Sequence, residues 1–385
     1  MSTDRAGFRL APEVPEPNCQ RMLDNFLTLV QIDSPSRQEA AVAAWCRQAF
    51  QALGCTVKVD DSAAETGSDT GNLIITWPAS PGQSGRLYFS AHMDTVEPGR
   101  GIQPVVKDGI IRAAGPTILG GDDKVGIAAA LEAIQTIGES GLAHPEVVLL
   151  LTTCEEIGLS GSKAMDGANF AGEPCFVLDS DGEIGGVVIG APFHVGFTAR
   201  FIGKASHAGA APEKGISAIQ MAAQAIAAMP FGRLDDSSTA NIGTIQGGSA
   251  DNVMAESCLV SGEFRALESE RIDEIKGQIV AAFDAAVTAA GGHVEMEFRQ
   301  SFHGFKLSEQ DPLVQLVLAV AESVGAKPQP RYTGGGSDAN IFAGKGLNPV
   351  VLSAGMADVH SLDESLAVAD MEDLTRMIIT IIISC

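Results

Sequence analysis

Apolar segments of strand length alternate with amphipathic segments of helical periodicity through the first half of this chain. The strand candidates cover 72–77, 86–90, 146–153 and 175–178, and the helix candidates cover 38–53 and 124–137. Both helix candidates contain alanine-rich stretches, which favour helix over strand. Strands that alternate with helices usually form a parallel sheet. The alternation therefore predicts an α/β domain built on a mixed, largely parallel sheet.

A second pattern interrupts the first between about residue 191 and residue 301. In chain order we expect a strand, a helix, two strands, a long helix and a strand, over 194–202, 216–229, 240–245, 258–265, 269–290 and 293–298. The order β-α-β-β-α-β is that of a split βαβ sandwich. The sequence therefore predicts an inserted α+β domain at 192–301 and a first domain formed by 1–191 and 302–385.

Composition narrows the class of protein. The chain has 385 residues, enough for one to three domains, and 45% of them are hydrophobic, as in globular proteins. The net charge of -23, from 25 basic and 48 acidic residues, argues against binding to nucleic acid or to an anionic membrane.

Cysteine usage and the distribution of apolar residues indicate a compartment. The seven cysteines are scattered without a CxxC pair, so we expect neither a disulfide framework nor a cysteine zinc site. The first 20 residues lack a signal-peptide pattern, and the longest apolar run, 377–383, is too short to span a bilayer. We therefore expect a soluble protein in the cytoplasm.

Almost all the notable histidine and acidic side chains of the first domain follow a predicted strand, and Asp122 and Asp123 open a helix after a glycine-rich loop. In chain order they are His92, Asp94, Asp122, Asp123, Glu155, Glu156, Asp179 and His360. Ligands of open α/β sheets bind at the carboxyl ends of the strands, so five segments bring these groups to one rim. Taken singly, paired acids are usually solvated turn residues. A charge directly after an apolar strand, however, has no packing reason to be there.

This set of donors indicates a metal site without thiolates. Imidazole and carboxylate ligands suit zinc, manganese or cobalt. The carboxylate of Asp94 is then expected to accept the second ring N–H of His92, because such a bond fixes the tautomer of a ligating histidine and raises its basicity.

The order of motifs resembles that of the M20 metallopeptidases, and within them the peptidase T-like tripeptidases. Each motif is weak alone, but together they are specific, and they cover nearly the whole chain. They are Ser90-Ala91-His92-Met93-Asp94-Thr95-Val96, Leu119-Gly120-Gly121-Asp122-Asp123-Lys124-Val125-Gly126, Thr153-Cys154-Glu155-Glu156-Ile157-Gly158, Val177-Leu178-Asp179, Gly203-Lys204-Ala205-Ser206-His207-Ala208-Gly209, Gly334-Gly335-Gly336-Ser337-Asp338-Ala339-Asn340 and Val359-His360.

The resemblance implies a zinc-peptidase-like catalytic domain with two zinc ions, interrupted by a smaller lid domain. Carried onto these positions, it makes Asp122 the carboxylate that bridges both metals. His92 and Asp179 would complete one metal site, and Glu156 and His360 the other. The peptide bond that follows the bridging aspartate is expected to be cis.

The resemblance also assigns roles outside the ligand set. Glu155 becomes the general base, with Asp94 beside it as a supporting catalytic carboxylate, and His207 of the lid becomes the candidate donor to the oxyanion. Without the resemblance, His207 would be interpreted as a surface loop histidine.

Substrate contacts are expected from Arg265, Asn241 and the glycine-rich turn that contains Gly335. For Arg265 the alternative is an ion pair with nearby acids. The turn at 334–340 matches the tripeptidases better than the deacylases of the family. Dimeric family members bring the histidine equivalent to His207 to the partner's active site, so a homodimer through the lid is a further hypothesis.

The leading functional hypothesis is a di-zinc aminopeptidase that removes the N-terminal residue from short peptides. The alternative is an M20-type deacylase that cleaves N-acyl amino acids with the same catalytic groups. A third hypothesis is a family member that has lost catalysis and acts as a binding protein. The third is disfavoured because all five expected ligands and Glu155 are present.

Overall fold

The computed structural model describes residues 10–11 and 13–385, and these form two compact units. The first unit comprises the chain up to Gly190, Leu307–Tyr332 and Ser337–Cys385, and the second comprises Ala191–Lys306 and Thr333–Gly336. The expected start of the first domain at residue 1 lies outside the described residues. The second unit extends beyond 192–301 at both ends and includes the glycine-rich turn, which was expected in the first domain.

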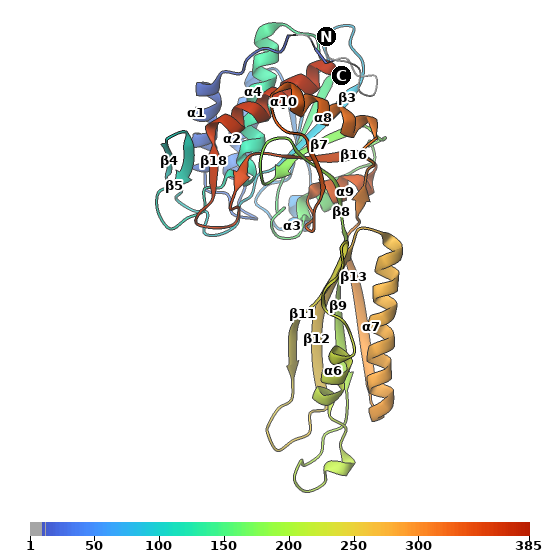
Figure 1. The fold of residues 1–385 in the computed structure, drawn as a ribbon. Helices are drawn as coiled ribbons and strands as arrows, with labels where there is room; N and C mark the ends of the chain where they lie inside the picture. Colours follow the sequence, from blue (N-terminus) through green and yellow to red (C-terminus); the bar gives the residue numbers. More distant parts are fainter. Residues whose placement is uncertain (1–9, 12) are drawn as a thin grey trace. The chain divides into compact units, whose positions relative to one another are not determined.

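The elements of the first unit can be followed in Figure 1. Its helices are α1 (Cys19–Val30), α2 (Ala40–Ala52), α3 (Ala63–Thr66), α4 (Gly121–Ser140), α5 (Ser160–Ala164), α8 (Pro312–Ser323), α9 (Asp338–Lys345) and α10 (Val368–Ser384). Its strands are β1 (Thr56–Val59), β2 (Leu73–Trp77), β3 (Arg86–His92), β4 (Pro104–Lys107), β5 (Ile110–Ala113), β6 (Glu146–Thr152), β7 (Pro174–Ser180), β8 (Gly186–Ala191), β15 (Gln329–Tyr332), β16 (Asn348–Ser353), β17 (Met356–Ala357) and β18 (Ser365–Ala367).

The main sheet of this unit is mixed and largely parallel at its centre. Its strands lie in the order β1-β2-β6-β3-β7-β16-β8, with β15 beside β8. Strand β3 pairs in parallel with β6 and β7, and β7 pairs in parallel with β16. Strands β1, β2 and β8 add antiparallel pairs, and β4, β5, β17 and β18 form a smaller sheet. The predicted α/β fold with a mixed, largely parallel sheet is confirmed.

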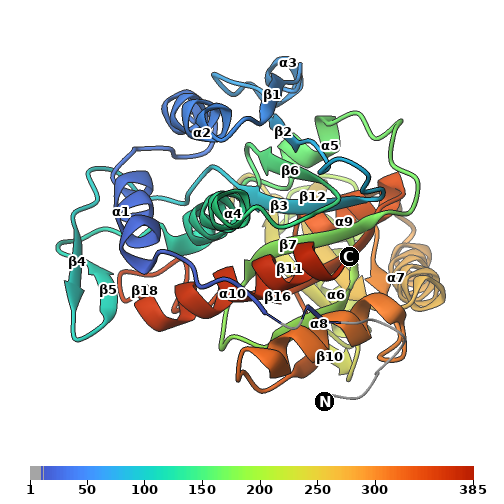
Figure 2. The ribbon, with the colours of Figure 1, turned by 90° about the horizontal axis from the view of Figure 1, so that it is seen from above.

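Helices cover both faces of the main sheet. Helix α4 packs on β3 and β7 between α1 and α10, as Figure 2 shows from above. On the same face Phe89 stacks on Phe176, with ring centroids 5.1 Å apart. On the other face Tyr88 meets the edge of Phe170, which meets Phe342 of α9. Because both faces are buried, the central strands are almost continuously apolar.

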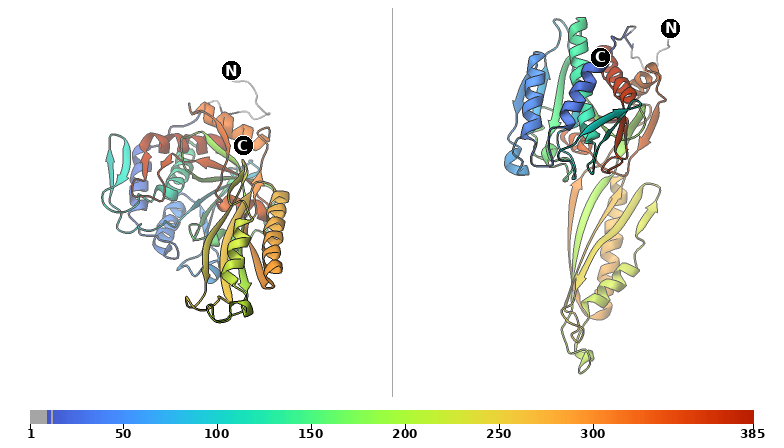
Figure 3. Two further views of the ribbon diagram at one scale, coloured as in Figure 1. Left: turned by 60° about the horizontal axis from the view of Figure 1, so that its bottom comes forward. Right: turned by 90° about the vertical axis from the view of Figure 1, so that its left-hand side faces the viewer.

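The second unit is an antiparallel sheet with two helices on one face (Figure 3). Its elements are β9 (Phe193–Ile202), the 3₁₀ helix Pro212–Lys214, α6 (Ala218–Ala227), β10 (Gly232–Asp235), β11 (Ser238–Gly247), β12 (Ser257–Ala266), α7 (Ser269–Ala290), β13 (His293–Phe302) and β14 (Phe305–Lys306). The sheet order is β10-β11-β12-β9-β13. Phe197, Phe201, Phe264 and Phe283 lie in a hydrophobic core that belongs to this unit alone. The predicted order β-α-β-β-α-β is found, with the 3₁₀ helix and the short strands β10 and β14 as additions.

Several element boundaries differ from the prediction, and the differences affect the candidate ligands. Strand β3 continues to His92 instead of ending at residue 90, and Asp179 lies inside β7 instead of after it. Helix α4 begins at Gly121, but Asp122 and Asp123 have non-helical backbone angles. His92 and Asp179 therefore lie at the ends of strands and Asp122 at an irregular helix start, while Glu156 and His360 lie in loops.

Candidate metal centre

The first group of potential ligands consists of His92, Asp122 and Asp179. They come from the end of β3, the start of α4 and the end of β7. His92 Nε2 lies 2.9 Å from Asp122 Oδ1 and 3.8 Å from Asp179 Oδ1. One ligand atom from each residue lies within 4.8 Å of those of the other two.

The second group consists of Asp122, Glu156 and His360. His360 Nε2 lies 3.1 Å from Asp122 Oδ2 and 2.9 Å from Glu156 Oε1. Asp122 thus turns one carboxylate oxygen toward each histidine. This is the arrangement that a carboxylate shared by two metal ions requires.

The spacing of the donor atoms suits divalent cations. Zinc binds imidazole nitrogen and carboxylate oxygen at about 2.0–2.2 Å, so two ligands of one ion lie at most about 4.4 Å apart. The measured separations of 2.9–3.8 Å between His92, His360 and their carboxylates fall within that limit. Among the described residues these are the two groups of this kind.

The electrostatics of the two groups favour a positive charge between the carboxylates. Burial alone lowers the pKa of His92, but the hydrogen bond to Asp122 and the charge of Asp179 raise that pKa well above its ordinary value. Hydrogen bonds to Asp122 and Glu156 raise the pKa of His360 to about 10. Burial raises the pKa of Asp179, and the charge of Asp122 raises it further. The carboxylates thus attract positive charge strongly. Either a proton on the histidines or a bound metal ion can supply that charge.

The peptide bond between Asp122 and Asp123 is cis, which confirms the expectation drawn from the resemblance. Asp123 belongs to neither ligand group: its carboxylate accepts the backbone N–H of His92 at 3.3 Å and that of Gly126 at 3.2 Å.

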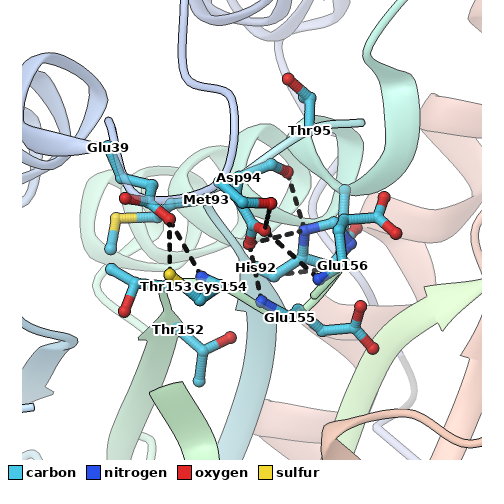
Figure 4. A network of polar contacts seen from close by, with 12 residues as sticks. Glu39, His92, Met93, Asp94, Thr95, Thr152, Thr153, Cys154, Glu155 and Glu156 are labelled. Atoms are coloured by element: carbon cyan, nitrogen blue, oxygen red, sulfur yellow. Dashed lines mark hydrogen bonds and ion pairs between the residues drawn. The ribbon is translucent and has the colours of Figure 1, made fainter. Parts of the chain in front are cut away.

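Four consecutive backbone N–H groups of residues 153–156 are bound by side chains from distant parts of the chain. Those of Thr153 and Cys154 bind Asn72 Oδ1 and Glu39 Oε1, each at 3.0 Å. Those of Glu155 and Glu156 bind the two carboxylate oxygens of Asp94, at 2.9 and 3.2 Å. The three acceptor side chains have no measurable exposure, and Figure 4 shows the bonds of Glu39 and Asp94.

This segment is fixed because its backbone is unusual. Cys154 has a φ of 54°, in the left-handed region that non-glycine residues rarely adopt. Such a conformation costs of the order of 1–3 kcal/mol and persists where the surroundings hold it in place. The bonds to Asn72, Glu39 and Asp94 supply that restraint and direct Glu155 and Glu156 from one rigid turn.

The contact between Asp94 and His92 differs from the expectation. His92 Nδ1 lies 2.9 Å from the backbone carbonyl oxygen of Asp94 and 3.6 Å from its carboxylate. The ring N–H is therefore donated to the carbonyl, because the carboxylate is engaged by Ser36 Oγ at 2.6 Å and by the two amides of Glu155 and Glu156.

The residues expected at the substrate all lie in the second unit, and Arg265 contacts the turn that contains Gly335. Arg265 donates to Glu263 at 2.8 Å and to the carbonyl oxygen of Gly334 at 2.9 Å, next to Gly335. Asn241 is exposed on β11. His207 is exposed in the loop after β9, where its Nδ1 accepts the N–H groups of Gly209 and Ala210 at 3.2 Å each.

Because Nδ1 of His207 accepts two hydrogen bonds, the proton of the neutral ring lies on Nε2. In this tautomer the Nε2–H group of the exposed side chain is available as a hydrogen-bond donor. A ring in this state can donate to a negatively charged oxygen.

Glu39 and Asn72 take part in the site although neither was identified from the sequence. They accept backbone N–H groups across 115 and 81 residues of chain, and such contacts leave no local motif.

The sheet and the two imidazole–carboxylate groups beside it have the form of a metal centre in an α/β protein. A family model described as peptidase family M20/M25/M40 matches residues 88–384. A relative from Bacillus subtilis, uncharacterized protein YqjE, is 39% identical over 365 residues, which are 95% of this chain and 98% of the relative.

Two solved structures match almost the whole chain. Aminopeptidase PepT from Bacillus cereus has a TM-score of 0.92 at 39% identity, covering 96% of this chain and 99% of that one. A tripeptidase from Staphylococcus aureus has a TM-score of 0.91 at 35% identity, with the same coverage. The chain therefore belongs to peptidase family M20/M25/M40, and it is a peptide hydrolase. Within the described residues, every helix is too short or too polar to cross a bilayer.

Proposed function

We propose that this protein is a two-metal aminopeptidase that removes the N-terminal residue from short peptides. The observation that carries the proposal is the shared carboxylate of Asp122, which lies 2.9 Å from His92 and 3.1 Å from His360 through different oxygens. His92, Asp122 and Asp179 would hold one cation, and Asp122, Glu156 and His360 the other. Zinc is the expected metal, with manganese or cobalt as alternatives.

When bound, two such cations polarise the substrate carbonyl and lower the pKa of water between them. Glu155 is the proposed general base. Burial raises its pKa well above the ordinary value, which makes the carboxylate a stronger proton acceptor. It would take the proton of the attacking water and give it to the amine nitrogen as the C–N bond breaks. General acid–base catalysis of this kind typically contributes about 10²–10⁴-fold.

The second unit is proposed to act as the lid, with His207 Nε2–H as donor to the oxyanion and Arg265, Asn241 and Gly335 as substrate contacts. Its β11 supports the further proposal of a homodimer. Strand β10 pairs with β11 only as far as Ala240, and no strand in the described part of the chain covers that edge over 241–247. Ile245 on this stretch is 50% exposed.

The preference for short peptides rests on the two solved relatives, an aminopeptidase and a tripeptidase. The net charge of -23 is consistent with a substrate that carries a free amino group, because a negative protein attracts cations over distances that salt limits to about 8–10 Å. A cytoplasmic location would suit such an enzyme.

The test compares Ala-Ala-Ala, its N-acetylated form and an N-acyl amino acid on the zinc-loaded protein. We expect Ala-Ala-Ala to be cleaved to Ala and Ala-Ala with the highest kcat/KM. Faster cleavage of either acylated compound would contradict the aminopeptidase proposal and support the deacylase alternative.

A further inference from the structure

The turn that leads into Asp122 is bound by one buried carboxylate. Glu364, only 2% exposed, accepts four consecutive backbone N–H groups. Its Oε2 accepts those of Leu119 and Gly120, at 2.8 and 2.9 Å, and its Oε1 accepts those of Gly121 and Asp122, at 2.7 and 3.2 Å. The carboxylate is therefore fully engaged by the backbone of this turn.

Two glycines in the turn, Gly120 and Gly121, favour this contact. Gly120 has a φ of 70°, and a left-handed residue before a helix start lets successive N–H groups converge on one anion. A Cβ atom at Gly121 would lie 3.1 Å from Glu364 Oε1, so a side chain there would crowd the carboxylate. The converging amides and the start of α4 both favour a negative charge, and Glu364 provides it.

Glu364 also connects two segments that carry candidate ligands. It lies four residues after His360, whose ring contacts the Asp122 carboxylate at 3.1 Å. The same short segment thus contacts Asp122 twice: His360 contacts the carboxylate of Asp122, and the carboxylate of Glu364 accepts the backbone N–H of Asp122. Neither ligand group of the described residues includes Glu364 itself.

We propose that Glu364 is a positioning residue for the metal centre: it fixes the backbone of 119–122 and thereby sets the direction of the Asp122 carboxylate toward both metal positions. This inference rests on the proposed two-metal function. It assigns to Glu364 an effect on both ions at once, because Asp122 is the one residue that the two groups share.

The decisive variant is Glu364→Gln, which keeps the size of the side chain. Its amide has one oxygen and one NH₂ group, so a donor would face two of the four backbone donors. We expect the dissociation constants of both zinc ions, measured by titrating the metal-free chain against a chromophoric chelator, to rise at least about ten-fold, as for other residues that orient metal ligands.

Glu132→Gln is the matched control. Glu132 is also fully buried and also lies on α4, where it accepts hydrogen bonds from the Asn18 backbone, Arg21 and Thr136. It lies ten residues beyond Asp122, about 15 Å along a helix. We expect this control to lower the midpoint of thermal unfolding while leaving both zinc affinities unchanged.

Zinc affinities of Glu364→Gln equal to those of the wild type would overturn the inference, as would an equal loss of affinity in Glu132→Gln. If Glu364→Gln does not fold, Glu364→Asp decides: it keeps the charge but is shorter, and we expect weaker binding of both ions, whereas unchanged affinity rejects the inference. A wild-type chain that binds no zinc would instead reject the proposed function.

Discussion

The carboxylate of Asp94 accepts the backbone N–H of Glu155 at 2.9 Å, and it makes this bond from a fully buried position. Its second oxygen accepts the next N–H, that of Glu156. Asp94 therefore orients the proposed general base and a candidate ligand through the backbone, while His92 is oriented by a carbonyl oxygen.

Asp94→Asn tests this relationship. The amide keeps one acceptor but turns NH₂ toward the other backbone donor, so Glu155 should shift although every candidate ligand remains. We expect kcat to fall about 10–100-fold, since small displacements of catalytic groups are costly, with two zinc ions still bound. Ser36→Ala, which removes only the hydroxyl bond to Asp94, should have a much smaller effect. A wild-type kcat for Asp94→Asn would show that the backbone bonds do not position the base.

Glu155→Gln and its neighbour Glu156→Gln separate proton transfer from metal binding. Glu155→Gln should retain both metals and lose turnover by about 10²–10⁴-fold, because an amide cannot take a proton from water. Glu156→Gln should lose metal, because Glu156 belongs to a ligand group. Elemental analysis and steady-state kinetics measure the two effects. A kcat within a few-fold of wild type for Glu155→Gln would assign the base elsewhere.

His207→Ala should lower kcat more than it raises KM, because a bond to the oxyanion forms only in the transition state. The position of the proton on Nε2, set by the bonds from Gly209 and Ala210 to Nδ1, makes the ring a suitable donor. His293→Ala is the control, since His293 is another exposed histidine of the same unit. Equal kinetics for both variants would remove His207 from the mechanism.

Low pH should reduce the stability of the second unit, because Glu263 becomes protonated. Its contacts with His194, at 2.7 Å, and Arg265, at 2.8 Å, lower the pKa of Glu263 from 4.5 to about 2. A carboxyl whose pKa is lower in the folded state adds stability above its unfolded pKa, and this stability is lost as the pH falls toward the folded pKa.

The measurement compares wild type and Glu263→Gln by hydrogen exchange of the β12 amides. We expect the wild type to have the higher free energy of opening at pH 6, and the difference to shrink between about pH 4.5 and pH 2. Glu295→Gln, at an exposed position on β13, should match the wild type throughout. A difference that is independent of pH would show that the charge of Glu263 adds nothing.

The sequence was most informative at positions where a potential metal ligand stands at the end of an apolar strand. His92 and Asp179 stand out because a polar group ends an apolar strand, so their approach to Asp122 could be expected before any coordinates. Helix α1 was also within reach: Asn18 caps it, and Met22, Phe26 and Leu29 recur at helical spacing.

Glu39, Asn72 and Glu364 could not be identified in this way. Each accepts backbone N–H groups. Almost every residue type has such a group, so the donors of these bonds leave no motif in the sequence. Glu364 meets Leu119 across 245 residues, a distance in sequence that only the folded chain closes. The predicted hydrogen bond from His92 to the carboxylate of Asp94 was wrong for the same reason. That carboxylate instead accepts the backbone N–H groups of Glu155 and Glu156.

The place of β16 in the sheet has a consequence for synthesis on the ribosome. This strand lies between β7 and β8, yet more than 150 residues of chain are translated after β8 before it emerges. The second unit, with its own core, can fold during that interval, since domains generally fold as units during synthesis. Until β16 is translated, the sheet of the first unit lacks the strand between β7 and β8. His360 is translated after β16. A nascent chain should therefore complete its two candidate ligand groups only after the whole second unit has been translated.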